Sequence, residues 1–369
     1  MRRSIEVEYW VIDDDGRLVE PGELVDASPG AEREFVEPLL EIKTTPCTST
    51  DELRDELFTR INAVVQRADE LGLGLVPLAT PMTEEPIERL PSERTGIQER
   101  AVGEPFEHVC CCAGTHIHIE QRPSREIDQL NVLTALDPAL ALVNSSPYAR
   151  QTPDVPGARS RLYRSAYDEI EYQGELWPYH SDTHEWRQRL EAAYDAFCRA
   201  AVNNGIEETA VESVFEPENA VWVPIKLRDT FSTVEWRSPD TALPSQVIKL
   251  ADDLVSIVEQ LVDAEVRIDG EVGLRTDDTI VLPEFETIES HVDAAISEGL
   301  ESDALRAYLD RMGFDISAYE PITREFDLGS DLTTSETRQI RLQYARKLES
   351  DVQRAPTTVT DGSTPTGKN

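Results

Sequence analysis

The chain has 369 residues, of which 72 are acidic and 35 are basic, so its formal net charge is −37. A surface this negative repels nucleic acid and anionic membranes, which argues against both as binding partners. With 39% hydrophobic residues, the chain can bury a sizeable core in one large domain or two.

The basic residues are almost all arginine, because only five of the 35 are lysine. Lysine is a strongly hydrated point charge, whereas arginine is weakly hydrated and forms fixed forks to carboxylates. An acid-rich, lysine-poor composition suits a protein that works in concentrated salt, where the screening length falls to about 3 Å near 1 M. An ordinary acidic bacterial protein is the alternative. We therefore expect a halophilic protein.

The cysteines and the N-terminus bear on the cellular location. The five cysteines include three in a row, Cys110 to Cys112, and no pair has CxxC spacing. An odd count without a disulfide pattern favours a reducing cytoplasm. The N-terminal residues enter a strand without an apolar region, so we expect no signal peptide. No stretch approaches the roughly 18 apolar residues of a membrane span.

The first part of the chain alternates between strand and helix patterns. Residues 4–12 are rich in β-branched and aromatic residues, which predicts a strand. Thr50 is the expected cap of a helix that Gly72 ends, Gly114 interrupts a later strand, and Pro138 marks a kink. In chain order we expect strands at 4–12, 34–45, 73–80 and 109–120, helices at 51–71 and 124–145, and a surface loop or lid at 81–107.

The second part begins with a long irregular stretch at 149–184, and such loops are often functional in compact enzymes. Residues 351–369 are rich in Thr, Pro and Gly, which predicts a disordered tail. Between them we expect a helix at 185–204, strands near 211–215, 220–226 and 231–238, a helix at 244–265, and mostly helical structure at 266–350.

The interleaved strands and helices show no regular βαβ rhythm. We therefore expect an α+β fold with a largely antiparallel sheet and flanking helices. Residues 1–350 are expected to form a single catalytic domain, because no internal repeat or linker divides them.

Acidic side chains follow the first two predicted strands. Glu6 and Glu8 are two residues apart, so both project from one face of the first strand. Adjacent carboxylates repel each other unless a cation lies between them, although a solvated strand face is the alternative. Glu41 shares a face of the second strand with Lys43 and Thr45, a pattern that an amphipathic strand also explains.

Two later strands carry further polar stripes. His116, His118 and Glu120 alternate with apolar residues, and the chain has only six histidines. Imidazole can bind a metal or contact phosphate as a cation, although hydrogen-bonded structural histidines are the alternative. Glu235 and Arg237 also share a face, which offers a metal ligand beside an anion-binding fork or, alternatively, a cross-strand salt bridge.

These stripes would line one oxygen-rich cleft if their four strands share a sheet. Such a cleft suits Mg²⁺, which takes oxygen ligands and bridges them to nucleotide phosphates. The sequence contains no P-loop, GxGxxG, G-x-S-x-G or HExxH motif, so the common nucleotide-binding, hydrolase and zinc-protease classes lack support.

The order of motifs resembles the glutamate–cysteine ligase type 2 (carboxylate-amine ligase) family over residues 1 to about 265. The motifs are, in order, SIEVEYWVID, LLEIKTTPC, LGLGLVPLATP, CAGTHIHIE, LNVLTALDPALALVNSSPY, SRLYRSAY and STVEWRSPD. The resemblance implies a glutamine-synthetase-like catalytic fold that uses ATP and Mg²⁺. Together with the composition, it resembles the halophilic archaeal members of that family.

The resemblance also assigns residues. Arg237 and His116 match groups that would stabilise the departing phosphate, and Arg164 matches a loop that would face the nucleotide or substrate. The chain departs from the family at Val7, at Thr80 and at Glu120, where an acid, a histidine and a glycine are usual. The metal ligands implied by motif are Glu6, Glu8, Glu41, His116 and Glu235.

The implied activity is ATP-dependent ligation of the γ-carboxyl of L-glutamate to L-cysteine, giving γ-glutamylcysteine, ADP and phosphate. Its partners would be small molecules, with no nucleic acid and no membrane, and the oligomeric state is left open. Three alternatives remain: a ligase of the same family with another acid or amine, a metal-dependent hydrolase built on the H-x-H strand, and a non-catalytic acidic binding protein.

We predict that the fold depends on molar salt. At about 0.01 M salt the screening length is about 30 Å, so carboxylates repel one another across the whole surface. The midpoint of thermal unfolding, followed by circular dichroism, should rise steadily between about 0.05 and about 3 M KCl. A flat or falling midpoint over that range would contradict the halophilic interpretation.

Overall fold

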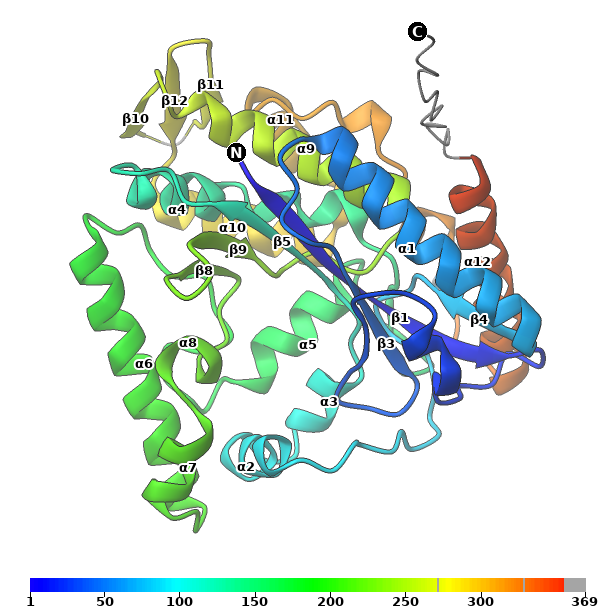
Figure 1. Ribbon diagram of the computed structural model, residues 1–369. Helices are drawn as coiled ribbons and strands as arrows, with labels where there is room; N and C mark the ends of the chain where they lie inside the picture. The colour runs from blue at the N-terminus through cyan, green and yellow to red at the C-terminus, as the bar shows by residue number, and fades with distance from the viewer. Residues whose placement is uncertain (271, 328, 355–369) are drawn as a thin grey trace, which may run out of the picture.

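A single antiparallel sheet organises the computed structural model, which describes residues 1–270, 272–327 and 329–354. Its strands follow the order β2-β3-β1-β5-β9-β8, and β4 pairs with the C-terminal part of β1 (Figure 1). The expected α+β class with a largely antiparallel sheet and flanking helices is confirmed. The strands are β1 Arg3–Asp13, β2 Ala31–Arg33, β3 Leu39–Lys43, β4 Leu73–Val76, β5 Thr115–Glu120, β8 Ile225–Arg228 and β9 Thr233–Trp236.

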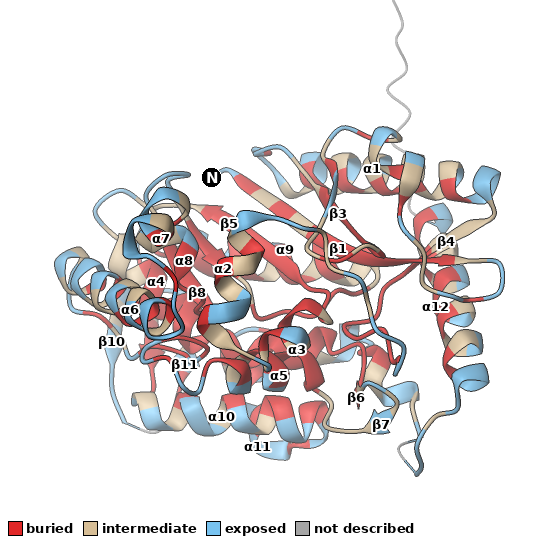
Figure 2. Cartoon of the chain, turned by 90° about the horizontal axis from the view of Figure 1, so that it is seen from below, coloured by how far each residue is buried: buried red, intermediate tan, exposed pale blue. Residues whose placement is uncertain are grey.

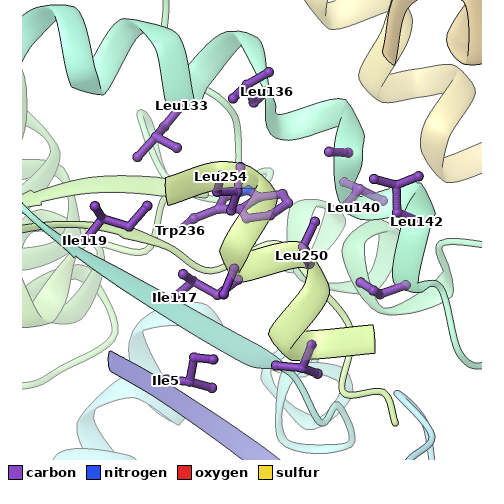
Figure 3. Close-up of a cluster of buried hydrophobic side chains, with 14 of the residues drawn as sticks. Ile5, Ile117, Ile119, Leu133, Leu136, Leu140, Leu142, Trp236, Leu250 and Leu254 are labelled. Carbon is purple, nitrogen blue, oxygen red and sulfur yellow. The ribbon is translucent and has the colours of Figure 1, made fainter. Parts of the chain in front are cut away.

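One face of this sheet is apolar and is covered by helices. Ile5 and Val7 of β1 are fully buried against α1 and α9, because alternate residues of a strand point to the same face. Figure 3 shows Ile117 and Trp236 from neighbouring strands meeting Leu254 of α9 in the same core. The helices on this side are α1 Thr50–Leu71, α4 Glu126–Ala135, the 3-10 helix η2 Asp137–Val143 and α9 Pro244–Gln260.

The opposite face of the sheet carries the acidic and imidazole stripes. A second group of helices lies on this side (Figure 1). Viewed from below, the sheet strands are largely red and therefore buried, whereas pale blue marks the outer sides of the helices (Figure 2). These helices are α2 Glu93–Val102, α3 Phe106–Cys110, α5 Ala158–Ala166, α6 Thr183–Asn203, α7 Glu208–Val214 and α8 Pro217–Ala220.

The C-terminal part combines a small sheet with three helices. The long last helix, α12, packs against α1 and β4 at one end of the molecule. No helix in the described part of the chain is long and apolar enough to cross a membrane. The elements are β10 Glu265–Ile268, β11 Leu274–Arg275, β12 Thr279–Leu282, α10 Phe285–Ser297, α11 Asp303–Arg311 and α12 Thr334–Arg354. The remaining short elements are β6 Tyr148–Ala149, β7 Thr152–Pro153, η1 Gly22–Asp26, η3 Gly299–Glu301, η4 Ile316–Ala318 and η5 Ile322–Glu325.

Several expected elements need correction. The expected strand at 211–215 is wrong, because those residues lie in or directly after helix α7, where Val211 is the residue that packs inward. The expected loop at 81–107 contains α2 and the start of α3, and the irregular stretch at 149–184 contains α5. The helix at 51–71 exists, but Ser49 is its cap, since its side chain accepts a hydrogen bond from the backbone of Glu52.

Other boundaries also move. The expected strand at 34–45 is ordered as a strand only over Leu39–Lys43, and the strand at 109–120 begins at Thr115 because α3 occupies its first residues. The strand near 220–226 begins at Ile225, after α8, and the mostly helical part at 266–350 also contains β11, β12 and most of β10. Helix α12 takes in residues 351–354 of the expected tail, and residues 355–369 lie outside the described part of the chain.

We predict that Leu254 is a main contributor to the core beneath the sheet. Replacing Leu254, whose side chain is fully buried in α9, with alanine should lower the free energy of unfolding by about 2–5 kcal/mol. Guanidinium titration of Val202→Ala, at an exposed position on α6, is the matched control and should show a change within about 0.5 kcal/mol. Equal stability of the two variants would contradict this packing.

Candidate active site

Strand register brings the polar stripes together on one face of the sheet. Glu8 of β1 lies opposite Glu41 of β3, and Glu6 lies opposite His116 of β5. On the other side of β5, His118 lies opposite Glu235 of β9. The side chains of seven residues therefore form a single group, here called the carboxylate cluster. It consists of Glu6, Glu8, Glu41, His116, His118 and Glu235, and of Glu34 from the segment between β2 and β3.

Three overlapping sets of side chains in the cluster could each hold a cation. Within each set the candidate ligand atoms lie within 4.8 Å of one another. The all-carboxylate set matches the preference of Mg²⁺ for oxygen ligands, whereas imidazole can also serve other divalent metals. The sets are Glu6, His118 and Glu235; Glu6, Glu41 and His116; and Glu8, Glu34 and Glu41.

Two members of the cluster were not among the ligands assigned from sequence. Glu34 belongs to a stretch whose alternation suggested a strand, and nothing in that pattern points to its contact with Glu41. His118 lies in the recognised H-x-H stripe, so the signal for it was present. Only the register of β5 against β9 places its ring beside Glu235.

The carboxylates at the β1–β3 side retain protons readily. Burial, followed by the negative charges of Glu34 and its neighbours, raises the pKa of Glu41 to about 9. Burial and the charge of Glu8 raise the pKa of Glu34 to about 7. Lys43, whose Nζ lies 2.7 Å from a carboxylate oxygen of Glu41, offsets only part of this repulsion. A bound cation would allow both groups to ionise.

The carboxylates at the β5–β9 side are held in the charged form instead. Burial alone would raise the pKa of Glu235, but the positive charge of Arg237 leads the groups that lower it well below its usual range. Glu235 also accepts a 2.5 Å hydrogen bond from Arg228. Burial similarly opposes ionisation of Glu6, yet its hydrogen bond with His116 leads the contacts that lower its pKa.

The two histidines suit metal binding. Burial and the charge of Arg237 lower the pKa of His116, which keeps its imidazole neutral near pH 7. Nε2 of His118 is buried and has no hydrogen-bond partner among the described residues. It lies 3.7 Å from Glu6 Oε1 and 3.8 Å from Glu235 Oε1. A buried, unpaired nitrogen between two ionised carboxylates fits a divalent cation, since buried polar groups are otherwise hydrogen-bonded.

Two cavities adjoin the carboxylate cluster. The first, of about 250 Å³, lies beside the hairpin of β8 and β9 and reaches Glu6 and His118; we call it the hairpin cavity. Phe231 lines this cavity and is 58% exposed, with its ring edge-on to His118. The second, of about 160 Å³, we call the arginine cavity. Its basic lining residues are Arg94, Lys226, Arg228 and Arg237.

Arg164 does not face the carboxylate cluster. Its guanidinium pairs with Asp137 at 2.8 Å, and Asp137 also accepts a hydrogen bond from the indole of Trp236. Trp236 packs on the helix-covered face of the sheet, so Arg164 points to the face opposite Glu235. Its expected contact with nucleotide or substrate therefore has no support from its position.

Arg159 lies on helix α5, five residues before Arg164, and contacts the backbone beside the carboxylate cluster. Its Nη1 donates 3.1 Å hydrogen bonds to the backbone carbonyls of Arg237 and Ser238. A side chain at Gly114 would bring its Cβ within 2.1 Å of the Arg159 guanidinium, which explains the glycine at the start of the H-x-H strand. The backbone N–H of Gly114 in turn donates to Glu8 at 2.6 Å. Arg159 thus supports the backbone that follows Glu235, and its close packing on Gly114 brings it next to the residue that bonds Glu8.

The fold and the carboxylate cluster occur in a chain that matches a family of carboxylate–amine ligases. Residues 5–282, more than half of the chain, match the profile of glutamate-cysteine ligase family 2 (GCS2). The chain therefore belongs to this family, which implies the use of ATP. No curated protein sequence matches the chain.

Two solved structures resemble the chain at low sequence identity. A bifunctional glutathione synthetase from Pasteurella multocida has a TM-score of 0.58 at 14% identity, covering 95% of this chain and 52% of that one. The chain thus spans about half the length of that protein, and the likeness shows the fold alone. A glutamate–cysteine ligase from Francisella tularensis in complex with AMP has a TM-score of 0.43 at 13% identity, covering 96% and 95% of the two chains.

We predict that Mg²⁺ stabilises the protein more strongly at high pH. The raised pKa values of Glu34 and Glu41 favour the folded state at low pH, and this contribution is lost as the pH rises through about 7 and about 9. Because Mg²⁺ binds the ionised carboxylates, its effect should grow over the same window.

The measurement is the shift in the thermal midpoint on adding Mg²⁺ at about pH 6 and about pH 9, with KCl of equal ionic strength as the control. In Glu41→Gln the difference between the two pH values should shrink, because that group no longer titrates. A Mg²⁺ shift that is the same at both pH values in the wild type would count against a metal site here.

Proposed function

We propose that the chain catalyses ATP- and Mg²⁺-dependent ligation of the γ-carboxyl of L-glutamate to the amine of L-cysteine. The products are γ-glutamylcysteine, ADP and phosphate. The observation that carries the proposal is the convergence of carboxylates and imidazoles from four strands beside the Arg228–Arg237 pair, in a member of this ligase family. Five free cysteines suit the cytoplasmic location that we include in the proposal.

Mg²⁺ bound in the cluster would neutralise negative charge between the nucleotide and the substrate carboxylate. The cluster can supply this role because its acids come from rigid strands and are already close together. Neutral His116 orients Glu6 through a 3.0 Å contact at Nδ1. The residues that would hold the metal are Glu6, Glu8, Glu41, His116 and Glu235, joined on geometric grounds by Glu34 and His118.

In this proposal Arg237 would hold the phosphoryl group. Glu235 and the other acids nearby outweigh the effect of burial and raise the pKa of Arg237, so its guanidinium stays charged throughout the reaction. Its Nε is buried and has no hydrogen-bond partner among the described residues, which leaves a donor for an anionic oxygen. In the proposed reaction, the γ-carboxylate of glutamate attacks the terminal phosphorus of ATP, and the cysteine amine then displaces phosphate from the acyl phosphate.

The protein's own cysteines are not suited to act as nucleophiles. Burial raises the pKa of Cys110 to about 12 and that of Cys111 to about 11, so both remain thiols at neutral pH. The thiolate is the reactive form of cysteine. Phosphoryl transfer to a carboxylate needs placement and positive charge and no covalent protein intermediate, and the cluster and Arg237 can provide these.

The test is an assay of ADP release in molar KCl with ATP, Mg²⁺, glutamate and a panel of amines. We expect release only when acid and amine are both present, with cysteine preferred. Glu6→Gln should lower turnover by about 100-fold or more, because a neutral amide is a poorer ligand for Mg²⁺. Glu70→Gln, an exposed position on α1, should leave turnover unchanged.

Other outcomes separate the alternatives. A clear preference for another amine would leave the chain a ligase of the same family and remove cysteine as its substrate. Turnover that needs the metal and no nucleotide would favour the hydrolase. Wild-type turnover in Glu6→Gln would remove Glu6 from the metal site.

A further inference from the structure

The arginine cavity is lined by four basic side chains, two of which have no acidic partner among the described residues. Arg228 and Arg237 both pair with Glu235, and Arg228 also pairs with Glu218. Lys226 and Arg94 differ from them, since no ion pair to either is formed among the described residues. Burial, followed by the charge of Arg237, lowers the pKa of Lys226 well below its usual range and also lowers that of Arg94, so an anion bound at this cavity would favour the charged form of both groups.

Lys226 and Arg94 form hydrogen bonds only to backbone carbonyls of the described residues, and the Arg94 guanidinium also lies over the ring of Phe215, 4.8 Å from its centroid. Lys226 lies on β8 directly opposite Glu235 and is 5% exposed, and its ammonium donates to the backbone carbonyl of Glu218 at 3.0 Å. Arg94 enters from α2 and donates to the backbone carbonyl of Asn219 at 2.6 Å. A buried ammonium with a single carbonyl partner keeps unused donors, since the group carries three.

Two further polar groups at this cavity have no partner among the described residues. The indole Nε1 of Trp222 is a buried donor, and Oε1 of Gln98 is a buried acceptor. Buried polar atoms are almost always hydrogen-bonded, so such a pair indicates a ligand that can both accept and donate. A carboxylate would accept from Trp222, and an ammonium would donate to Gln98.

The volume of the cavity and the residues that line it limit the kind of ligand that it can bind. Its volume of about 160 Å³ lies below the roughly 300–1,000 Å³ of sites for drug-sized molecules, which favours an amino acid over a nucleotide. Tyr163 and Tyr167 stack on Trp222, with ring centroids 4.6 and 6.1 Å away. These aromatic faces suit a short aliphatic chain and an ammonium group.

We infer that the arginine cavity binds the acid substrate as an α-amino dicarboxylic acid, with Lys226 and Arg94 holding its α-carboxylate. The distal carboxyl then lies at the Arg237 end, where the carboxylate cluster begins. The ammonium faces Gln98. The inference rests on the proposed function, which supplies the reaction. It adds the residues that determine which acid is bound.

The test compares L-glutamate with 4-aminobutyrate, which lacks the α-carboxylate, by calorimetry on the full chain in molar KCl. Wild type should bind glutamate more tightly than 4-aminobutyrate. In Lys226→Met and Arg94→Met the affinity for glutamate should fall by about 10- to 100-fold, while that for 4-aminobutyrate stays the same. The KM for glutamate should rise by a similar factor and the KM for ATP should not change.

Lys249→Met is the matched control, because Lys249 lies on α9 and pairs with Asp253. It should leave both affinities unchanged. Lys226→Met should also raise the thermal midpoint of the ligand-free protein, since it replaces a buried amine, whose charged form burial disfavours, with an apolar side chain. That gain in stability would show that the variant folds, and Arg94→Met provides a second test at a less buried position.

The outcomes distinguish this inference from the proposed function. If ligation of glutamate proceeds but both variants raise the KM for ATP and not that for glutamate, the cavity holds the nucleotide and the inference is overturned. If another dicarboxylic amino acid is the substrate and its binding is lost in both variants, the inference stands while glutamate is replaced. Unchanged affinity for every acid in both variants would also overturn it.

Discussion

Repulsion between carboxylates on one face of a sheet is the constraint on which the rest of this structure depends. Antiparallel pairing places Glu8 directly opposite Glu41 and adds Glu34 within the same few ångströms. Like charges opposite each other destabilise a sheet, so the arrangement survives through the burial of the apolar face beneath it. The helices α1 and α9 provide that burial, which stabilises the sheet enough for several acids to lie close together on its polar face. The apolar core therefore holds in place a group of acids that would separate without it.

The two ends of the cluster relieve the repulsion in different ways. At the β1–β3 side, raised pKa values keep protons on the acids, whereas at the β5–β9 side two arginines keep Glu235 ionised. A metal entering the cluster would displace protons at one end and meet preformed negative charge at the other. Arg228 and Arg237, which neutralise Glu235, also line the arginine cavity. The same two residues therefore connect the proposed metal site with the proposed anion-binding site.

Alternation along each strand made much of this predictable from sequence. It identifies Glu6, Glu41, His116 and Glu235 as polar residues on otherwise apolar strands, and these four do come together. What alternation cannot supply is the register between strands far apart in the chain. Glu34 joins the cluster through a loop that follows β2, and the sequence contains no signal for that contact. Apart from α6, which the expected helix at 185–204 matches, the helices on the polar side were missed, because segments such as 93–102 carry few apolar residues and bury only a narrow side.

The motif around Arg164 shows a different limit. Adjacent residues on a helix point in directions about 100° apart, so neighbours in one motif can serve opposite faces of a sheet. Here Tyr163 lines the arginine cavity, while Arg164 turns to Asp137 on the apolar side. Arg94 and Lys226 do line the cavity. From the sequence, Arg94 was expected in the surface loop or lid at 81–107, and Lys226 was expected at the end of the strand near 220–226.

The proposed effects of salt and of a bound metal would involve separate populations of acidic residues. In molar KCl the screening length is about 3 Å, which is enough to suppress repulsion between carboxylates that face water. The cluster is different, because Glu41 is 2% exposed and Glu235 is fully buried, and screening by dissolved ions is weak where solvent does not reach. Concentrated salt can therefore hold the outer surface together and still leave the cluster strained. Inside the cluster the repulsion can be relieved by protons, by the arginines or by a bound cation, so the proposed adaptation to salt and the proposed use of a divalent metal would be two separate physical requirements of the same chain.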